Sequence, residues 1–346
     1  MTTRTLLTGK APRQQLHRRK SRHALRRIAP SRTNLEAHRK SAWWPWAKRI
    51  ATVVFFSLVA WLLVTNARNV DWSDVGSAIK AYPWPTMMAA AALAACSHVL
   101  YSTYDLLGRY YTRHTLSTGH VMKITFISYA FNLNLGSLIG GVAFRYRLYS
   151  KAGVGTGKVT RILSMSMLTN WLGYFVLAGT VFTFWPLVLP GTWKMSEETM
   201  PVLGMGLLGV ALAYLVTCAV SRTHELRFRG RTLELPTLPV ALLQVAMSCA
   251  NWMLIASIVY VLLPESVGFT DVLSVLLIAA VAGVITHVPA GLGVLEAVFV
   301  ALLSHLMPTG QLLAALLTYR AVYYIAPLIV ATGLYVTTEV RQRRKR

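Results

Sequence analysis

The sequence predicts an all-α, polytopic integral membrane protein with six spanning helices and two re-entrant helical hairpins arranged as an inverted repeat. Two observations predict the membrane class. Only 14% of the 346 residues are charged, and apolar runs long enough to cross a bilayer recur along the chain. A third observation, the distribution of Lys and Arg among the loops, predicts which of these runs cross and which turn back.

The two basic ends determine the predicted orientation. Fourteen Lys and Arg precede Ile50 with one acid, Glu36, and five more close the chain after residue 340. Such a run can bind nucleic acid, but residues 1–41 lack apolar periodicity, so we interpret them as a disordered cytosolic tail near anionic lipid headgroups. Residues 341–346 form a second basic cytosolic end. We expect no nucleic-acid partner.

The membrane domain is predicted to cover residues 42–340. It divides into repeat A, residues 50–186, and repeat B, residues 201–336. With the basic ends inside, every loop obeys the charge rule if the chain has six spans and two hairpins. The predicted spans are residues 50–67, 84–107, 162–186, 201–220, 240–263 and 312–336.

The apolar stretch at residues 124–144 conflicts with a full crossing. If it spanned, the basic residues from Arg145 to Arg161 would lie outside, against the charge rule. A hairpin that enters from the cytosol and leaves by the same face removes this conflict. The stretch also contains residues that weaken a continuous helix, namely Asn132, Asn134, Gly136, Gly140 and Gly141.

A second hairpin is predicted around a break that contains Pro289, Gly291 and Gly293. Its two limbs are each about 24 Å of helix, against an apolar core of about 30 Å. Irregular backbone at membrane depth is tolerated only where protein or a water-filled cavity satisfies it, so the break indicates a site. Glu296 lies five residues past Gly291 and, as an ionisable group in a bilayer, needs a partner.

The two hairpins align with each other. Each carries a glycine, four residues and then a charge, so that Gly140 and Arg145 correspond to Gly291 and Glu296, with opposite signs. In an inverted repeat, broken helices meet near the midplane and build a substrate site. We therefore predict that Arg145 and Glu296 pair with each other. The alternative for Arg145 is that it snorkels to the cytosolic headgroups.

Polar side chains also follow single faces of several predicted spans. Asp105 lies on the face that carries His98, and Arg320 lies one turn from Tyr324. Two interpretations remain open for these faces: a shared water-filled interior, or ordinary interhelical hydrogen bonding. The charged residues Asp105 and Arg320 need stronger compensation than the uncharged polar residues. The other residues of these faces are Tyr101, Ser102, Ser166, Asn170, Tyr174, Gln244, Ser248 and Asn251.

Motifs of soluble enzymes are missing from the sequence, which has no GxSxG, phosphate loop or HExxH pattern. The three cysteines, Cys96, Cys218 and Cys249, sit singly in apolar stretches, and the nine histidines are scattered. We expect no enzyme activity, cofactor, metal or disulfide.

The motifs resemble one known family, the lysylphosphatidylglycerol synthase transmembrane region. The resemblance covers about residues 50–340 and rests on Asn134, Gly140-Gly141 with Arg145, the Pro289-to-Glu296 motif, and Tyr319-Arg320 with Tyr323-Tyr324 and Pro327. Where the family usually has Pro-Gly-Gly, this chain has Pro289-Ala290-Gly291. The family includes the flippase half of bacterial multiple peptide resistance factors and stand-alone inner-membrane proteins.

The resemblance implies that Arg145, Glu296 and Asp105 correspond to charged residues of a lipid-translocating cavity. The bifunctional relatives continue into a soluble aminoacyl-transferase domain, whereas this chain ends at Arg346, so we expect no synthase activity.

The leading functional hypothesis is a bacterial inner-membrane phospholipid translocator, with an aminoacylated lipid as one substrate class. Arg145 and Arg320 would hold the lipid phosphate, with Glu296 and Asp105 balancing their charge. Two alternatives remain: a scaffold or regulator of a lipid-synthesis enzyme, and a secondary transporter of a small solute. The predicted site residues are Arg145, Glu296, Arg320, Asp105, Asn134, Gly140, Gly141, Pro289, Gly291 and Gly293.

Overall fold

The computed structural model describes residues 57, 77, 80, 82–187, 198–221, 225–228, 231–286 and 291–344. All of these except residue 57 belong to one compact unit, Leu62–Arg346. Three predicted features lie outside the described residues: the tail at residues 1–41, nearly all of the first span at residues 50–67, and Pro289.

The first half of this unit contains a long bent segment, a helical hairpin and a long helix. Helices α3 and α4 are separated only by Thr103, and Gly136, with φ of +82°, separates α5 from a π-helical turn. The bounds are α3 (Trp84–Ser102), α4 (Tyr104–Thr112), α5 (Thr118–Leu135), η1 (Ser137–Ala143), α6 (Phe144–Lys151) and α7 (Thr156–Phe184).

The second half contains two long helices, a second hairpin and a final long helix that is π-helical at its middle. The bounds are α8 (Thr199–Val220), β1 (Glu225–Phe228), β2 (Arg231–Glu234), α9 (Leu238–Tyr260), α10 (Phe269–Thr286), α11 (Val294–Leu303), α12 (Thr309–Arg320), η3 (Ala321–Ile325) and α13 (Ala326–Arg344). Strands β1 and β2 pair antiparallel, with Glu225 opposite Glu234. This short ribbon in the α8–α9 loop is an exception to the predicted all-α class.

Five described helices are long and apolar enough to cross a membrane: α7, α8, α9, α10 and the continuous helix Thr309–Val340. The chain is therefore a polytopic membrane protein, and four of the five coincide with predicted spans. The predicted span at residues 84–107 is not among them, since its polar face lowers the hydropathy of α3. Helix α10, predicted as one limb of a hairpin, is among them.

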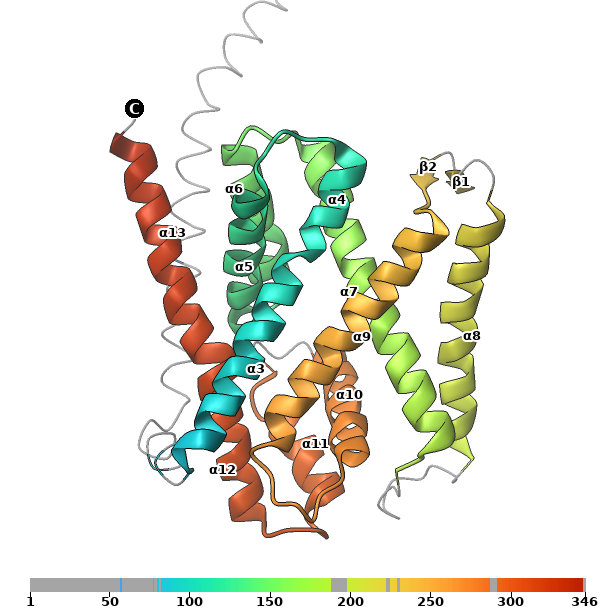
Figure 1. Cartoon of the computed structure of the whole chain (residues 1–346), viewed down its shortest axis with the longest axis vertical. Helices are drawn as coiled ribbons and strands as arrows, with labels where there is room; N and C mark the ends of the chain where they lie inside the picture. The colour runs from blue at the N-terminus through green and yellow to red at the C-terminus, as the bar shows by residue number, and fades with distance from the viewer. Residues whose placement is uncertain are drawn as a thin grey trace, which may run out of the picture. The chain divides into compact units, whose positions relative to one another are not determined.

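Two helical hairpins occur where the sequence predicts them. In the first hairpin, α5 packs against η1 and α6, and in the second, α10 packs against α11. In Figure 1 the α4–α5 and α6–α7 connections and the β1–β2 ribbon lie at one end of the unit. The α9–α10 and α11–α12 connections lie at the other end. Each hairpin therefore begins and ends at the same end of the unit.

The turn of the first hairpin corrects one detail of the predicted repeat. The chain reverses at Gly136, not at Gly140, which lies inside η1. A Cβ at Gly140 would lie 2.2 Å from the backbone N of Asn132, so this glycine allows η1 to pack closely on α5. In both hairpins the charged residue follows the aligned glycine by five positions. In the first hairpin this glycine is not the turn, so the number of residues between the turn and the charge differs between the two hairpins.

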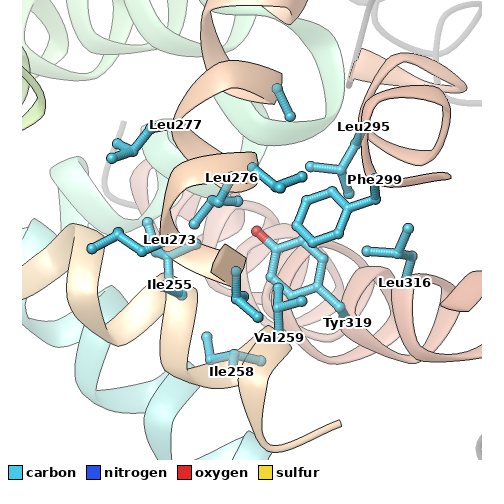
Figure 2. Close-up of a cluster of buried hydrophobic side chains, with 14 of the residues drawn as sticks. Ile255, Ile258, Val259, Leu273, Leu276, Leu277, Leu295, Phe299, Leu316 and Tyr319 are labelled. Atoms are coloured by element: carbon cyan, nitrogen blue, oxygen red, sulfur yellow. The ribbon is translucent and has the colours of Figure 1, made fainter. Parts of the chain in front are cut away.

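The main apolar cluster joins the second hairpin to its neighbours. Leu273 and Leu276 of α10, Phe299 of α11 and Tyr319 of α12 pack with Ile258 of α9, as Figure 2 shows. In contrast, only 17% of the apolar membrane-length segment of α8 is buried inside the structure. A helix that is hydrophobic all round and unburied is expected to face lipid.

Candidate functional site

Arg145 lies at the start of α6 and is buried, with only 3% of its surface exposed. Its Nε is 3.3 Å from Oδ2 of Asp105, which is fully buried on α4. The same Oδ2 accepts a hydrogen bond of 3.0 Å from the Tyr149 hydroxyl. Within the described part of the chain, Nε and Nη2 of Arg145 and Oδ1 of Asp105 are buried without a hydrogen-bond partner, so the contact between the two residues is an ion pair only. This ion pair therefore has donors and an acceptor in reserve.

Arg320 lies at the end of α12 and closes the turn of the second hairpin. Its guanidinium donates to Glu296 through Nε and, at 2.9 Å, through Nη2. Nη2 also donates to the carbonyl oxygen of Gly291 at 2.9 Å. The pairing is bidentate, a geometry in which guanidinium and carboxylate bind most strongly. The irregular backbone of the second hairpin is therefore hydrogen-bonded by Arg320, a charged side chain of the last span.

The predicted pairing of Arg145 with Glu296 is wrong. Each of these residues has an oppositely charged partner, but Arg145 pairs with Asp105 and Glu296 pairs with Arg320. Sequence alignment of the hairpins favoured a pair between them, whereas each charge is neutralised by a neighbouring helix. The alternative of snorkelling does not hold for Arg145 either, because its side chain is buried.

Four tyrosines lie between the two ion pairs; we call Tyr101, Tyr129, Tyr323 and Tyr324 the tyrosine chain. At one end the Arg145 guanidinium lies 5.8 Å from the Tyr101 ring centre, and Tyr101 stacks on Tyr129. The Tyr129 and Tyr323 hydroxyls are 2.8 Å apart. At the other end, Tyr324 contacts Tyr323 and lies 5.4 Å from the Arg320 guanidinium. The tyrosine chain therefore links the two arginines through a continuous series of aromatic contacts.

Other polar residues of the predicted faces form interhelical hydrogen bonds. Gln244 donates to Thr169 at 2.8 Å and accepts from Tyr214, and Ser248 donates to the Asn170 carbonyl oxygen at 2.9 Å. Asn251 accepts from Ser97 at 2.8 Å. These contacts agree with the interpretation as interhelical hydrogen bonding, whereas Oγ of Ser166 and Nδ2 of Asn251 are buried without a hydrogen-bond partner in the described structure.

The remaining predicted site residues shape the two hairpins. Asn134 donates to the Tyr324 carbonyl oxygen at 3.2 Å, which joins α5 to η3. Gly141 lies close to Asn132, as Gly140 does. Gly291 and Gly293 have φ of +56° and +77°, a region that favours glycine. These residues build the backbone around the charges.

An apolar groove lies beside the tyrosine chain, between α3, α5 and the η3–α13 segment. Its volume is about 660 Å³, and its walls include Ala94, Phe126 and Pro327. Three polar side chains line it, His98 and Ser102 from α3 and Lys123 from α5. The ring of His98 also contacts Tyr129 and Tyr323. His98 therefore lines the groove and also contacts the tyrosine chain.

His114 lies near the Arg145 end of the site, in the loop between α4 and α5. Burial, together with the positive charges of Arg109 and Lys158, lowers the pKa of this imidazole. His114 is therefore neutral at neutral pH and adds no further cation there. Its ring lies 6.0 Å from that of Tyr149.

Three residues that contact the site were not predicted from the sequence: Ser97, Tyr129 and Tyr149. Tyr149 follows a basic stretch of α6 and reaches Asp105 only because α6 folds back toward α4. Tyr129 shares one helical face with Thr125, Ser128 and Asn132, at the spacing i, i+3, i+4 and i+7, so the polar periodicity of the sequence could have indicated it. Among the described residues, no group of three or more His, Cys, Asp or Glu is placed to hold a metal ion.

The sequence matches a known family over most of its length. The profile of the lysylphosphatidylglycerol synthase TM region matches residues 46–331. Inner membrane protein YbhN of Escherichia coli is 43% identical over 304 residues, which cover 88% of this chain and 96% of that protein. An uncharacterized protein of Synechocystis is 29% identical over 286 residues. Phosphatidylglycerol lysyltransferase of Staphylococcus haemolyticus is 24% identical over 81% of this chain and 32% of the longer protein. The chain belongs to the lysylphosphatidylglycerol synthase TM region family.

Proposed function

We propose that this protein translocates phospholipids across a bacterial inner membrane, with both termini in the cytosol. One observation carries the proposal: two arginine–carboxylate pairs, one fully buried and one with a partly exposed Glu296, lie at the two ends of the tyrosine chain. A transporter of a water-soluble solute needs no apolar groove beside its polar site. A lipid translocator needs both, a polar path for the headgroup and an apolar surface for the acyl chains. Buried charges within membrane helices are expensive and mark substrate pathways.

The charge balance of the site suits an anionic headgroup. Arg145 makes a single contact with Asp105 through Nε and keeps Nη2 unpartnered, so a phosphate oxygen has a donor to bind. Guanidinium binds phosphate as it binds carboxylate, through paired donors. Asp105 and Glu296 neutralise the empty site and so prevent the two arginines from trapping the lipid. Arg320 is the second phosphate contact, reached when the headgroup displaces Glu296.

The two hairpins are proposed to be re-entrant from opposite faces. Helices α5 and α10 have 18 residues each, or about 27 Å of helix, slightly less than an apolar core of about 30 Å. Both ends of the first hairpin lie at the end of the unit that also carries the basic loops, which we assign to the cytosol. The predicted glycines, Asn134 and Pro289 are proposed to shape the passage.

The relatives support a lipid-related role. The Staphylococcus relative is named for phosphatidylglycerol, and the Escherichia coli relative is named as an inner membrane protein. We further propose that the basic tail contacts anionic headgroups and that a lipid-synthesis enzyme is a partner.

The test is lipid translocation in proteoliposomes that contain the full chain. A dithionite-accessible fluorescent phospholipid measures transfer between leaflets. We expect wild type to transfer lipid and the Arg145→Ala and Arg320→Ala variants to lose most of this activity, because each removes a phosphate contact. Lys158→Gln is the matched control, since it removes a positive charge from an exposed position on α7.

Two results would overturn the proposal. If wild type moved no lipid above empty vesicles, the protein would be a scaffold or a transporter of another solute. A scaffold would lose its cellular role on deletion of residues 1–41, while the Arg145 and Arg320 variants kept it. If wild type and both arginine variants moved lipid equally, translocation would stand but the assigned site would be wrong.

A further inference from the structure

The end of helix α13 is joined to the first hairpin by four polar side chains, Arg147, Lys151, Tyr335 and Glu339, which we call the latch. The Tyr335 hydroxyl accepts a hydrogen bond of 3.0 Å from Nε of Arg147 and donates one of 3.0 Å to Oε1 of Glu339. The same carboxylate oxygen lies 3.4 Å from Nη2 of Arg147 and also accepts a hydrogen bond from Lys151. Three side chains therefore donate to one carboxylate oxygen.

Tyr335 also makes the apolar contact between α13 and the first hairpin. Its buried ring lies 6.3 Å from the ring of Phe131 on α5 and 5.5 Å from that of Phe144 on α6, measured between ring centres. Phe131 and Phe144 stack on each other at 4.2 Å. Because Phe144 directly precedes Arg145, the end of α13 rests on the part of the hairpin that carries the buried Asp105–Arg145 pair.

The rest of α13 packs sparsely on the described unit. From Pro327 to Val340, Ala331 and Tyr335 are the only residues that are buried in the described structure. In Figure 1 the far end of α13 lies at the same end of the unit as α6. The described packing of this segment is therefore concentrated at two positions, and one of them belongs to the latch.

The chain before α13 is anchored and then interrupted. Arg320 fixes the end of α12 to the second hairpin through the Gly291 carbonyl oxygen, and Asn134 of α5 donates to the Tyr324 carbonyl oxygen of η3 at 3.2 Å. The turn η3 is π-helical, and Pro327, which has no backbone N–H to donate, follows two residues after its end. Helices bend at π-helical turns and at proline, so this position is suited to act as a hinge.

The strength of the latch suits a contact that opens and closes. The side chains of Arg147, Lys151 and Glu339 are 18%, 29% and 21% exposed, so solvent and salt screen their attraction. Ion pairs of this kind are weak, whereas separating a fully buried pair such as Asp105–Arg145 leaves uncompensated charge in an apolar interior. The latch therefore can break at a free-energy cost that thermal motion supplies.

We propose that α13 is a hinged gate that pivots at η3 and Pro327 and is held closed on the first hairpin by the latch. In the closed state Glu339 is the internal counterion of Arg147 and Lys151. When the latch breaks, the end of α13 moves away from the first hairpin while α12 stays in place. This inference goes beyond the proposed function, because it concerns how the described unit opens, whatever passes through it.

The test is the distance between two spin labels on the full chain in nanodiscs, measured by pulsed electron paramagnetic resonance in a cysteine-free background. One label is on Thr337→Cys of α13 and the other on Gly157→Cys near the start of α7, and both positions are exposed. With an intact latch we expect one dominant distance. Glu339→Ala should raise the ratio of displaced to docked α13 by about two- to thirtyfold, the range that the loss of two partly exposed ion pairs gives.

Two further variants tie the displacement to the latch. Arg147→Ala/Lys151→Ala removes both cations and should displace α13 about as much as Glu339→Ala. Adding Glu339→Ala to this double variant should change the distances little further, because the ion pairs are already lost. Glu265→Ala is the matched control, since it removes an exposed carboxylate from the α9–α10 loop and should leave the distances unchanged.

A second label pair tests the hinge. Gly310→Cys lies in the first turn of α12, before the hinge, and its distance to Gly157→Cys should stay the same in Glu339→Ala. If both label pairs shifted together, the last helix would move as one rigid body and the hinge would be wrong. An unchanged Thr337 distance in Glu339→Ala would overturn the whole inference, because other contacts would then hold α13 in place.

Lipid-transfer assays on the same variants keep the two proposals distinguishable. Lipid transfer by wild type without any displacement of α13 in Glu339→Ala would overturn only the gate. Displacement of α13 in Glu339→Ala, with no lipid transfer by wild type, would overturn the proposed function and leave the gate in place.

Discussion

At the scale of single residues, the two ion pairs are built differently. Arg320 uses two nitrogens on Glu296 and one of them also on the Gly291 carbonyl oxygen, so it anchors the turn of the second hairpin. Arg145 contacts Asp105 through Nε only, and its Nη2 is without a partner in the described structure. The Arg320–Glu296 pair therefore also holds the backbone of the second hairpin in place, whereas the Arg145–Asp105 pair keeps hydrogen-bonding atoms without a partner in the described structure.

The Asp105–Arg145 pair allows stability and function to be separated. Asp105→Leu leaves the Arg145 charge buried without compensation, and we expect it to destabilise the protein by about 3–5 kcal/mol. The double variant Asp105→Leu/Arg145→Met removes both charges, so it should recover most of the lost stability but not lipid transfer. Unfolding in detergent micelles and transfer in vesicles measure the two effects. A double variant that is no more stable than Asp105→Leu would contradict the pairing.

Lysine in place of arginine distinguishes the two sites further. Arg320→Lys cannot reproduce the bidentate contact or reach Gly291 at the same time, so it should lower both the unfolding temperature and lipid transfer. Arg145→Lys keeps a single charge contact and should lower the unfolding temperature less. Thermal unfolding of both variants in the same detergent tests the order. The opposite order would mean that Arg145 is the structural anchor.

At the scale of secondary-structure elements, the first hairpin depends on close packing of η1 on α5. Three of its glycines differ in what a methyl group would meet. At Gly140 it would collide with the Asn132 backbone, and at Gly141 it would touch the Asn132 side chain at 3.0 Å. At Gly119, near the start of α5, it would meet nothing within 4 Å.

These glycines predict a graded series of alanine variants. Gly140→Ala should destabilise the protein by about 1–3 kcal/mol or more, because backbone atoms cannot move aside as a side chain can. Gly141→Ala should cost less, since the Asn132 side chain can turn away. Gly119→Ala should be neutral or stabilising by up to about 1 kcal/mol, because alanine favours helix. Denaturation midpoints in detergent measure the series, and equal effects at Gly140 and Gly119 would contradict the close packing.

At the scale of the whole molecule, the hairpins distribute the loops between the two ends of the described unit. The α4–α5 and α6–α7 loops lie at the end with the β1–β2 ribbon, and the α9–α10 and α11–α12 loops lie at the other (Figure 1). If α5 or α10 instead crossed the membrane alone, one loop of each pair would change sides. The proposed re-entrant topology is therefore open to a direct labelling test.

Single cysteines in a cysteine-free background report the side of each loop. With a membrane-impermeant maleimide on intact cells or right-side-out vesicles, we expect no labelling at Thr115→Cys and Gly155→Cys and labelling at Ser266→Cys and Thr309→Cys. All four positions are exposed in the structure, so burial does not explain a difference. Permeabilised membranes provide the control. Opposite labelling of Thr115→Cys and Gly155→Cys would show that the first hairpin crosses.

The sequence by itself determined the membrane class, four of the spans, the existence of two breaks and the identity of the four charged residues that form the two ion pairs. These follow from local properties, because hydropathy, helix-weakening glycines and the cost of a buried charge can be read along the chain. Family membership was also readable from local motifs.

Only the tertiary structure decided how the charges pair. Arg145 faces Asp105 because α6 packs on α5 and α7, which both pack on α4, and Glu296 faces Arg320 because α12 packs beside α11. Such contacts depend on the packing of helices distant in sequence, which spacing within one helix does not encode. The same reason explains why Gly136, not Gly140, forms the turn, and why Tyr149 is recognised as part of the site only from the folded structure.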